Sequence, residues 1–345
     1  VKEPQYPLYA NYYLLKGGFI GLLFRIYHLI HSVLILPFYP NVFPSVARRF
    51  YKIAKGIIEK NGTEIILATY TPYDGIWAGM KLKKEYGNSI KFVTYHLDLM
   101  FSPDNEGKVK GLKIKIGKKA FAKELVIADK ILVPENTEID KHPKIKAVGF
   151  PLYVKEQEVA TSSFEFPKNS INLTYIGSLS SSNRDPFLAI KAIELLGKEI
   201  GKKVIFHIWG VLGDKNCQET VNESPCVDYH GLADNNEVAS LLVKSDILIN
   251  ISNGTTYKMI PSKIFQYFAI GKPIIDFVKN EKDVSLPFFE KYPESLIIRE
   301  YNQELDEIVR LLKSFIKDRR ERNVFSVDAL FENFKPETIC KEILN

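Results

Sequence analysis

Apolar residues along this chain occur in short runs, and many of the segments between them show helical spacing of apolar positions. Runs rich in β-branched and aromatic residues predict strands, and the longer amphipathic segments predict helices. In the first part of the chain we expect strands at 64–70, 90–95, 131–134 and 145–150 and helices at 73–86 and 117–128. This alternation is typical of a parallel sheet covered by helices on both faces.

The same alternation restarts after residue 170. The segment 153–170 is charged, rich in Ser and Thr and irregular, so we interpret it as a linker. Beyond it we expect strands at 172–176, 204–209, 227–229, 247–251 and 273–277 and helices at 185–200, 235–244 and 262–269. Two such sets predict two Rossmann-like α/β domains, 1–152 and 171–326, with the active site in a cleft between them.

Both ends of the chain carry an expectation of their own. A last helix near 336–344 lies in a C-terminal segment, about 327–345, that we expect to return to the first domain. The chain of 345 residues suits two domains, but it opens at Val1 without a glycine-rich strand–turn–helix unit. We therefore expect that the N-terminal domain is incomplete in this sequence, by one or two βα units of about 30 residues each.

The most apolar stretch is 17–39, which Arg25, His28 and His31 interrupt at helical spacing. A bilayer-crossing helix needs about 20 predominantly apolar residues with few or no charges. We therefore interpret the stretch as one or two amphipathic helices that end at Pro37 and Pro40. Two roles remain open for it, namely packing on its own domain and lying in a membrane interface.

Charge and cysteine content give limited information about the ligands and the cellular location of the protein. The chain has 47 Lys and Arg against 41 Asp and Glu, a net charge of +6 that suits a polyanionic ligand or an anionic membrane surface. Three cysteines without a CxxC pair, and histidines without metal-ligand spacing, argue against a disulfide framework and a zinc site. We expect a cytoplasmic protein, peripheral on the inner face of the plasma membrane if 17–39 meets lipid, with no nucleic-acid partner.

Several common catalytic motifs are absent from the sequence. No two Asp residues are two positions apart, which leaves no Asp-x-Asp pair for Mn²⁺ or Mg²⁺. There is also no GxxxxGK[ST] loop, no HExxH and no GxSxG. These absences leave kinase, metalloprotease and serine hydrolase functions without support.

The segment 250–275 carries the clearest candidate chemistry. A predicted strand ends at Ile251, a polar loop follows, and Ile260, Pro261, Ser262 and Lys263 open a helix. Pro suits the first helical turn because it has no N–H to leave unbonded. The free N–H groups that follow and the positive end of the helix dipole form an anion site, to which Lys263 and Lys258 add charge. A diphosphate is the ligand that this arrangement predicts, although an ordinary capped helix would have the same pattern.

The same segment resembles the C-terminal signature of retaining glycosyltransferases of family four, which have the GT-B fold. The residues that match its PSK-type motif are Pro261, Ser262, Lys263, Phe265, Gly271, Lys272 and Pro273. Where the family usually has a Glu that holds the donor ribose, this chain has Gln266, and where it has an acid eight residues earlier, this chain has Lys258. The resemblance implies a nucleotide-sugar donor site in the second domain.

Three further segments of the second domain add donor-side candidates. Gly177, Ser178 and Arg184 follow a predicted strand, in the order of a phosphate-binding loop before a helix. The resemblance implies an Arg directly after this glycine and a Lys some six residues later, both of which neutralise the diphosphate. This chain has Ser178 in place of the Arg, and Arg184 can take the place of the Lys. Gly210 resembles a family glycine near the nucleotide, and the segment around His230 resembles one that reads the base. Structural roles for Arg184 and His230 remain open.

In the first domain, His96 ends a predicted strand, where a catalytic group is expected. The resemblance implies that it orients the donor sugar, whereas a structural histidine is the alternative. Thr71, Tyr73 and Asp74 lie in a strand-to-helix loop that we expect on the acceptor side.

Together these residues predict a sugar transferase of bacterial type. The resemblance implies that the enzyme retains the anomeric configuration. We also expect that it needs no metal or other cofactor and uses a UDP- or GDP-sugar. Its acceptor would be a glycan, a lipid-linked glycan or a protein, as in polysaccharide biosynthesis. The alternatives are a catalytically weak GT-B partner subunit or nucleotide-sugar-binding protein, and a nucleotide-sugar epimerase.

Overall fold

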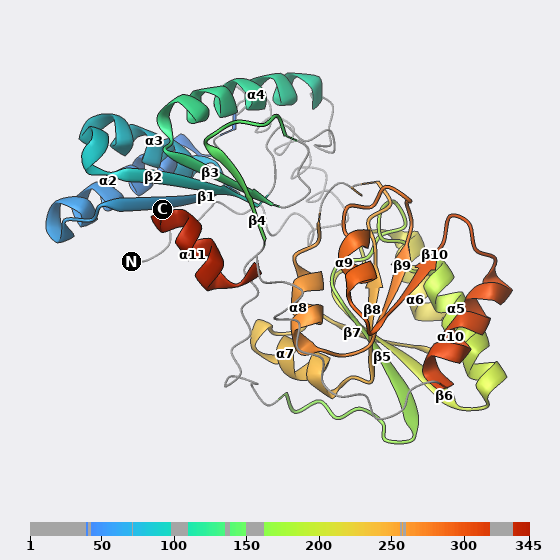
Figure 1. Cartoon of the computed structure of the whole chain (residues 1–345). Helices are drawn as coiled ribbons and strands as arrows, with labels where there is room; N and C mark the ends of the chain where they lie inside the picture. The colour runs from blue at the N-terminus through green and yellow to red at the C-terminus, as the bar shows by residue number, and fades with distance from the viewer. Residues whose placement is uncertain are drawn as a thin grey trace, which may run out of the picture. The chain divides into compact units, whose positions relative to one another are not determined.

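The computed structural model describes residues 39–40, 43–70, 72–97, 110–134, 139–149, 162–255, 257, 260–317 and 334–345. The chain divides into two compact units (Figure 1), one of Val1–Gly149 with Ile339–Asn345 and one of Phe150–Thr338. Apart from Tyr39, the apolar stretch 17–39 lies outside the described residues. No helix in the described ranges is long and apolar enough to cross a membrane.

The first unit contains a four-stranded parallel sheet in the order β1-β2-β3-β4. Its strands are β1 (Ile65–Tyr70), β2 (Lys91–His96), β3 (Lys130–Pro134) and β4 (Ile145–Val148). Its helices are α2 (Pro44–Asn61), α3 (Asp74–Tyr86) and α4 (Lys110–Ile127), with a short 3-10 helix η3 (Gly87–Ser89) between α3 and β2. The helix α4 begins earlier than the predicted 117, and α2 was not predicted.

The two faces of this sheet are covered by different parts of the chain. Alternate residues of a strand point to opposite faces, so Phe92 packs in the core beneath α3 and α4, while Val93 packs in the opposite one. There it meets Ile339 of the last helix, α11 (Pro336–Leu344). Lys91 Nζ donates to the carbonyl oxygen of Leu344 (2.8 Å) and binds the C-terminal end of that helix. The chain therefore returns to its first unit at its end.

The second unit contains a six-stranded parallel sheet in the order β10-β9-β8-β5-β6-β7. The order reverses between β8 and β5, and this is the topological switch point at which α/β proteins bind ligands. The strands are β5 (Ser170–Ile176), β6 (Lys203–Trp209), β7 (Val227–Gly231), β8 (Ile247–Ile251), β9 (Ile274–Val278) and β10 (Ser295–Arg299).

Six helices of the described residues cover both faces of this sheet. They are α5 (Phe187–Ile200), α6 (Lys215–Glu223), α7 (Asn235–Lys244), α8 (Lys263–Ile270), α9 (Leu286–Lys291) and α10 (Leu305–Lys317). The strand β8 shows how the core is divided: Ile247 and Ile249 pack in the core with α5 and α10, and Leu248 packs in the core with α8 and α9. The elements α6, α9, β10 and α10 were not predicted.

The predicted linker is part of the second unit where the structure describes it. Lys244 Nζ donates to the carbonyl oxygens of Ser162 (2.9 Å) and Phe164 (3.1 Å). The rings of Phe164 and Phe166 pack edge-on against Trp209, with centroids 5.3 and 6.1 Å away. The apolar rings anchor this segment despite its polar composition, and β5 already begins at Ser170.

Candidate functional site

Three glycines lie at the carboxyl ends of neighbouring strands β5, β6 and β7. Gly177, Gly210 and Gly231 have φ angles of 152°, 147° and 74°, which residues with a side chain rarely adopt. Gly177 N–H donates to Trp209 O (2.8 Å), and Gly210 N–H donates to Gly231 O (2.6 Å). A Cβ on Gly210 would lie 1.8 Å from Gly177 O, so this close approach of two backbones requires glycine.

The loops that follow β5 and β8 are hydrogen-bonded to each other beside the switch point. Gly254 N–H donates to Asn183 O (2.8 Å), and Thr255 N–H and Oγ1 both donate to Asn183 Oδ1 (3.0 and 3.1 Å). Arg184 Nε donates to Asn253 Oδ1 (2.7 Å). These bonds hold the predicted phosphate-binding residue Arg184 near the carboxyl ends of the central strands, next to the loop after β8.

The helix α8 brings a second cation to the same edge. Ser262 is its N-cap residue and has an exposed side chain, Pro261 before it is buried, and Ile260 is half-buried. Lys263 begins the helix and extends its side chain over the ring of Tyr175 at the end of β5, with Nζ 3.7 Å from the ring centroid. A Cβ on Gly177 would lie 3.3 Å from this Nζ atom. The structure thus brings Gly177, Ser178, Arg184 and Lys263 together.

The ammonium group of Lys263 is buried and has no hydrogen-bond partner among the described residues. Burial lowers the pKa of this lysine well below its usual value, the charge of Arg184 lowers it further, and Asp276 opposes the shift. A buried cation without a hydrogen-bonded anion is costly in free energy. An anion bound beside Nζ would offset this cost.

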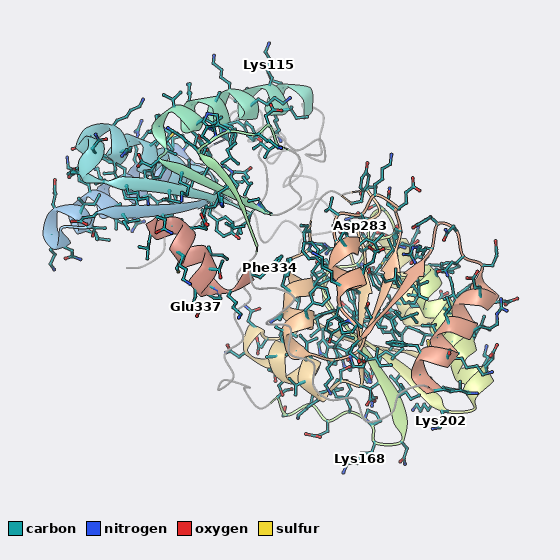
Figure 2. All side chains as sticks on the ribbon, viewed as in Figure 1. Lys115, Lys168, Lys202, Asp283, Phe334 and Glu337 are labelled. Atoms are coloured by element: carbon teal, nitrogen blue, oxygen red, sulfur yellow. The ribbon has the colours of Figure 1, made fainter. Side chains whose placement is uncertain are left out.

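Two buried carboxyl groups, which the sequence did not indicate, lie in the same region of the second unit as Lys263 and Arg184. Asp276 in β9 accepts a hydrogen bond from Asn250 Nδ2 (2.7 Å), and burial raises its pKa. Asp283 follows β9 and accepts from Ser285 N (2.7 Å) and Ser285 Oγ (2.6 Å), and burial raises its pKa too. In Figure 2, Asp283 lies at the opposite end of the unit from Lys168 and Lys202, which precede strands β5 and β6.

The remaining donor-side predictions fall in different surroundings. Gln266 is on the exposed side of α8, and Lys258 lies outside the described residues. His230, in β7, stacks on Trp209 with centroids 4.2 Å apart, and its Nε2 atom lies 3.1 Å from Nδ1 of His207. Burial lowers the pKa of His207 to about 4, and it also lowers the pKa of His230. His207 was not among the predicted residues.

In the first unit, His96 ends β2 as the sequence predicted, and it is fully buried. Its Nε2 atom lies 2.7 Å from Glu124 Oε1 in α4, which also accepts from Thr94 Oγ1 (2.6 Å). Sequence reasoning did not find Glu124, because it lies inside a helix with no motif around it. The pair forms a polar contact inside the unit.

The predicted acceptor-side residues Tyr73 and Asp74 follow β1, the strand that pairs with the strand of His96. Tyr73 and Asp74 are buried; Tyr73 OH donates to Ala120 O (3.4 Å) and Asp74 Oδ1 accepts from Phe43 N (3.2 Å). Thr71 lies outside the described residues. The rings of Tyr70 and His96 lie 5.6 Å apart, which links the ends of β1 and β2.

Comparison with known proteins identifies the fold. No protein-family model matches the sequence, and no curated protein matches it. Among solved structures, TarM is similar with a TM-score of 0.50 and 14% identity, over 81% of this chain and 54% of TarM. OtsA has a TM-score of 0.50 and 11% identity, over 86% of this chain and 73% of OtsA. The UDP-GlcNAc 2-epimerase of Methanocaldococcus jannaschii has a TM-score of 0.52 and 13% identity, with 87% and 81% covered.

These similarities define an α/β protein with the GT-B fold, as the sequence predicted. The chain spans only 54% of the length of TarM. The identities are low, so the likeness establishes the arrangement of strands and helices and leaves the chemistry to the residues of the site.

Proposed function

We propose that this protein is a glycosyltransferase that takes its sugar from a nucleotide-diphosphate donor. The observation that carries the proposal is the buried ammonium of Lys263, which has no hydrogen-bond partner among the described residues and lies beside the glycine-ended strand β5. Together with Arg184 it makes the switch point of the second sheet cationic. A diphosphate would supply the hydrogen-bonded anion that Lys263 lacks among the described residues.

The donor diphosphate would be bound by backbone and side-chain groups together. The first turn of α8 and the hydroxyl of Ser262 suit phosphate oxygens, because the positive end of a helix dipole favours anions. Within that turn, the N–H groups of Ile264 and Phe265 already donate to Pro261 O (3.1 Å) and Ser262 O (3.3 Å). Lys263 and Arg184 would neutralise the charge that develops on the leaving diphosphate. Two cations in this position would do the work that a divalent metal does in other transferases, so we propose metal-independent transfer.

The finer assignments follow from the resemblance of the PSK segment to retaining family-four enzymes. Gly210 and His230 would lie near the base of a UDP- or GDP-sugar, and Gln266 near its ribose. Retention implies transfer on the front face of the sugar, for which no enzymic base is assigned. The side chain of Gln266 is exposed, which supports a contact with a ligand rather than with the core.

On the acceptor side, His96 would orient the donor sugar, and Glu124 would fix the orientation of its ring. The acceptor would be a glycan, a lipid-linked glycan or a protein, reached from the loop of Thr71, Tyr73 and Asp74. We further propose a cytoplasmic enzyme of polysaccharide biosynthesis that contacts the membrane through residues 17–39.

Two observations favour rival functions. The buried carboxyls Asp276 and Asp283 are groups that an epimerase needs for proton transfer, and an epimerase is among the similar structures. Gln266 and Ser178, where the family has an acid and a cation, favour a binding protein with weak or no turnover.

Incubation of the protein with a panel of UDP- and GDP-sugars, followed by mass spectrometry of the products, tests the proposal. A transferase releases the nucleoside diphosphate, slowly to water and faster with a suitable glycan acceptor. An epimerase interconverts the sugar nucleotide, and a passive binder leaves it intact. Release should fall at least about tenfold in Arg184→Met, while Lys202→Met, at the other end of the sheet, serves as the matched control.

A further inference from the structure

Three potential metal ligands converge on neighbouring strands of the second unit, away from the residues that would hold the diphosphate. His207 in β6 is the register partner of Asp228 in β7, and His230 follows two residues later on the same strand. The distance between His207 Nδ1 and His230 Nε2 is 3.1 Å. Asp228 Oδ2 lies 3.6 Å from each of these nitrogens.

We propose that His207, Asp228 and His230 form a binding site for a divalent transition-metal ion, with zinc as the expected occupant. In a tetrahedral zinc site with bonds of about 2.0–2.1 Å, neighbouring ligand atoms are separated by about 3.3 Å. The three distances in this cluster bracket that value. Two imidazoles and one carboxylate leave a fourth position for water or another ligand.

The hydrogen bonds around His207 fix which of its nitrogens can bind a metal. Asn172 Nδ2 donates to Pro167 O (3.1 Å) and Asp246 Oδ2 (3.2 Å), so its Oδ1 atom must be the acceptor that faces His207. His207 Nε2 lies 3.2 Å from that oxygen and therefore carries the ring proton. Nδ1 keeps its lone pair and faces His230 and Asp228. Metal-binding histidines typically donate their other nitrogen to an oxygen in this way.

The surroundings of the cluster suit a site that holds structure rather than one that turns over substrate. Aromatic rings enclose it, with Phe166 4.8 Å from His207 and Phe164 4.9 Å from His230 between ring centroids. The side chain of Asp228 is 54% exposed and leaves an entry from solvent, whereas His207 is fully buried. An ion here would bind the edge strand β7 to β6.

This inference shares His230 with the proposed donor site, where that residue would lie near the base. The ion would take no part in the transfer step, and zinc binding is measured without a sugar nucleotide, so either proposal can fail while the other stands. The zinc proposal departs from the sequence-based expectation of no zinc site, because that expectation rested on spacing along the chain. His207 and His230 meet only through the pairing of β6 with β7.

The test is a calorimetric titration of the metal-free protein, carrying no histidine tag, with zinc alone, together with elemental analysis after dialysis. We expect one zinc per chain and a higher melting temperature with zinc. Asp228→Asn should weaken zinc affinity by at least about tenfold, as losses around metal ligands commonly do, and His230→Gln should weaken it further. His142→Gln, an exposed histidine of the first unit, and Cys340→Ser, an exposed cysteine, should bind zinc like the parent protein.

Fluorescence gives a second and local readout. The chain has two tryptophans, so Trp77→Phe leaves only Trp209, whose ring centroid is 4.2 Å from that of His230. Cu²⁺ or Ni²⁺ should quench this fluorescence in proportion to occupancy, and Asp228→Asn should shift the quenching to higher metal concentration. A natively folded protein that binds no zinc, or variants at Asp228 and His230 that bind zinc as the parent does, would overturn the proposal.

Discussion

The ammonium nitrogen of Lys263 lies 3.7 Å from the centroid of the Tyr175 ring, and the hydroxyl of that tyrosine donates to Ser178 O (3.0 Å). The aromatic face attracts the cation but cannot replace a hydrogen-bonded anion. One contact thus connects the start of α8 with the loop after β5, which are the two segments that would hold a diphosphate.

We predict that Lys263→Met leaves the free protein at least as stable as the parent. The substitution removes a buried charge that lacks a hydrogen-bond partner among the described residues, and replacing such a charge by an apolar side chain of similar length is often neutral or stabilising. Thermal unfolding without ligand measures this. A large loss of stability would mean that the ammonium is satisfied in the folded protein, contrary to the account of the site.

Gly210→Ala should be strongly destabilising. Its Cβ would overlap Gly177 O at 1.8 Å, and the φ angle of 147° is unfavourable for alanine. We expect a loss of at least about 3 kcal/mol in the free energy of unfolding, measured with denaturant. Gly56→Ala in α2 is the matched control, because its Cβ meets nothing within 4 Å. There we expect a gain of about 0.5–1 kcal/mol, since Ala favours a helix interior over Gly. Equal effects of the two substitutions would contradict the close approach of the loops.

Gln266→Glu separates an active transferase from a passive binder. The side chain at 266 is exposed, so a carboxylate there keeps its hydration and can accept a charged hydrogen bond from a donor ribose. We expect several-fold tighter binding of the nucleotide sugar, because charged hydrogen bonds contribute up to about 3 kcal/mol against about 1 kcal/mol for neutral ones. The transferase account predicts that turnover rises as well. Unchanged affinity and turnover would mean that position 266 does not touch the donor.

His96→Gln should lower the rate of sugar transfer and leave nucleotide binding by the second unit unchanged. In the parent protein, Glu124 Oε1 is hydrogen-bonded to His96 Nε2 and Thr94 Oγ1. The amide introduced by His96→Gln can still donate to Glu124, so we expect the variant to fold. His96→Ala would leave Glu124 with one bond fewer and should cost about 1–3 kcal/mol of stability in addition. Turnover of His96→Gln equal to that of the parent would exclude a role for His96 in orienting the sugar.

The fold could be predicted where the hydrophobic pattern was regular. The bounds expected for α7, β8 and α11 agree with the structure, and the GT-B fold is confirmed. The helix α10 was missed although Ile308, Val309 and Leu312 form one buried stripe in the main core of the second unit, at helical spacing. The apolar face of α10 could have been predicted from the sequence. The short edge strand β10 and the six-residue helix α9 are too short for a clear pattern of apolar positions.

The site could be predicted only as separate segments. A glycine or lysine after a strand marks a loop, but the order of strands in the sheet decides which loops meet. Tyr175 meets Lys263, and Arg184 meets Asn253, because β5 pairs with β8 at the switch point. The partners Glu124 of His96 and His207 of His230 were missed for the same reason, since neither has a motif of its own.

Calorimetric titration of the protein with UDP and with GDP, each compared with its nucleoside, tests the central claim most directly. The account predicts that one of the two diphosphates binds and that the nucleoside binds much more weakly, because the affinity comes from Lys263, Arg184 and the start of α8. Lys263→Met should lower the affinity for that diphosphate by at least about tenfold, and Lys202→Met should leave it unchanged. Absence of binding by both diphosphates, or binding that Lys263→Met does not weaken in a folded protein, would contradict it.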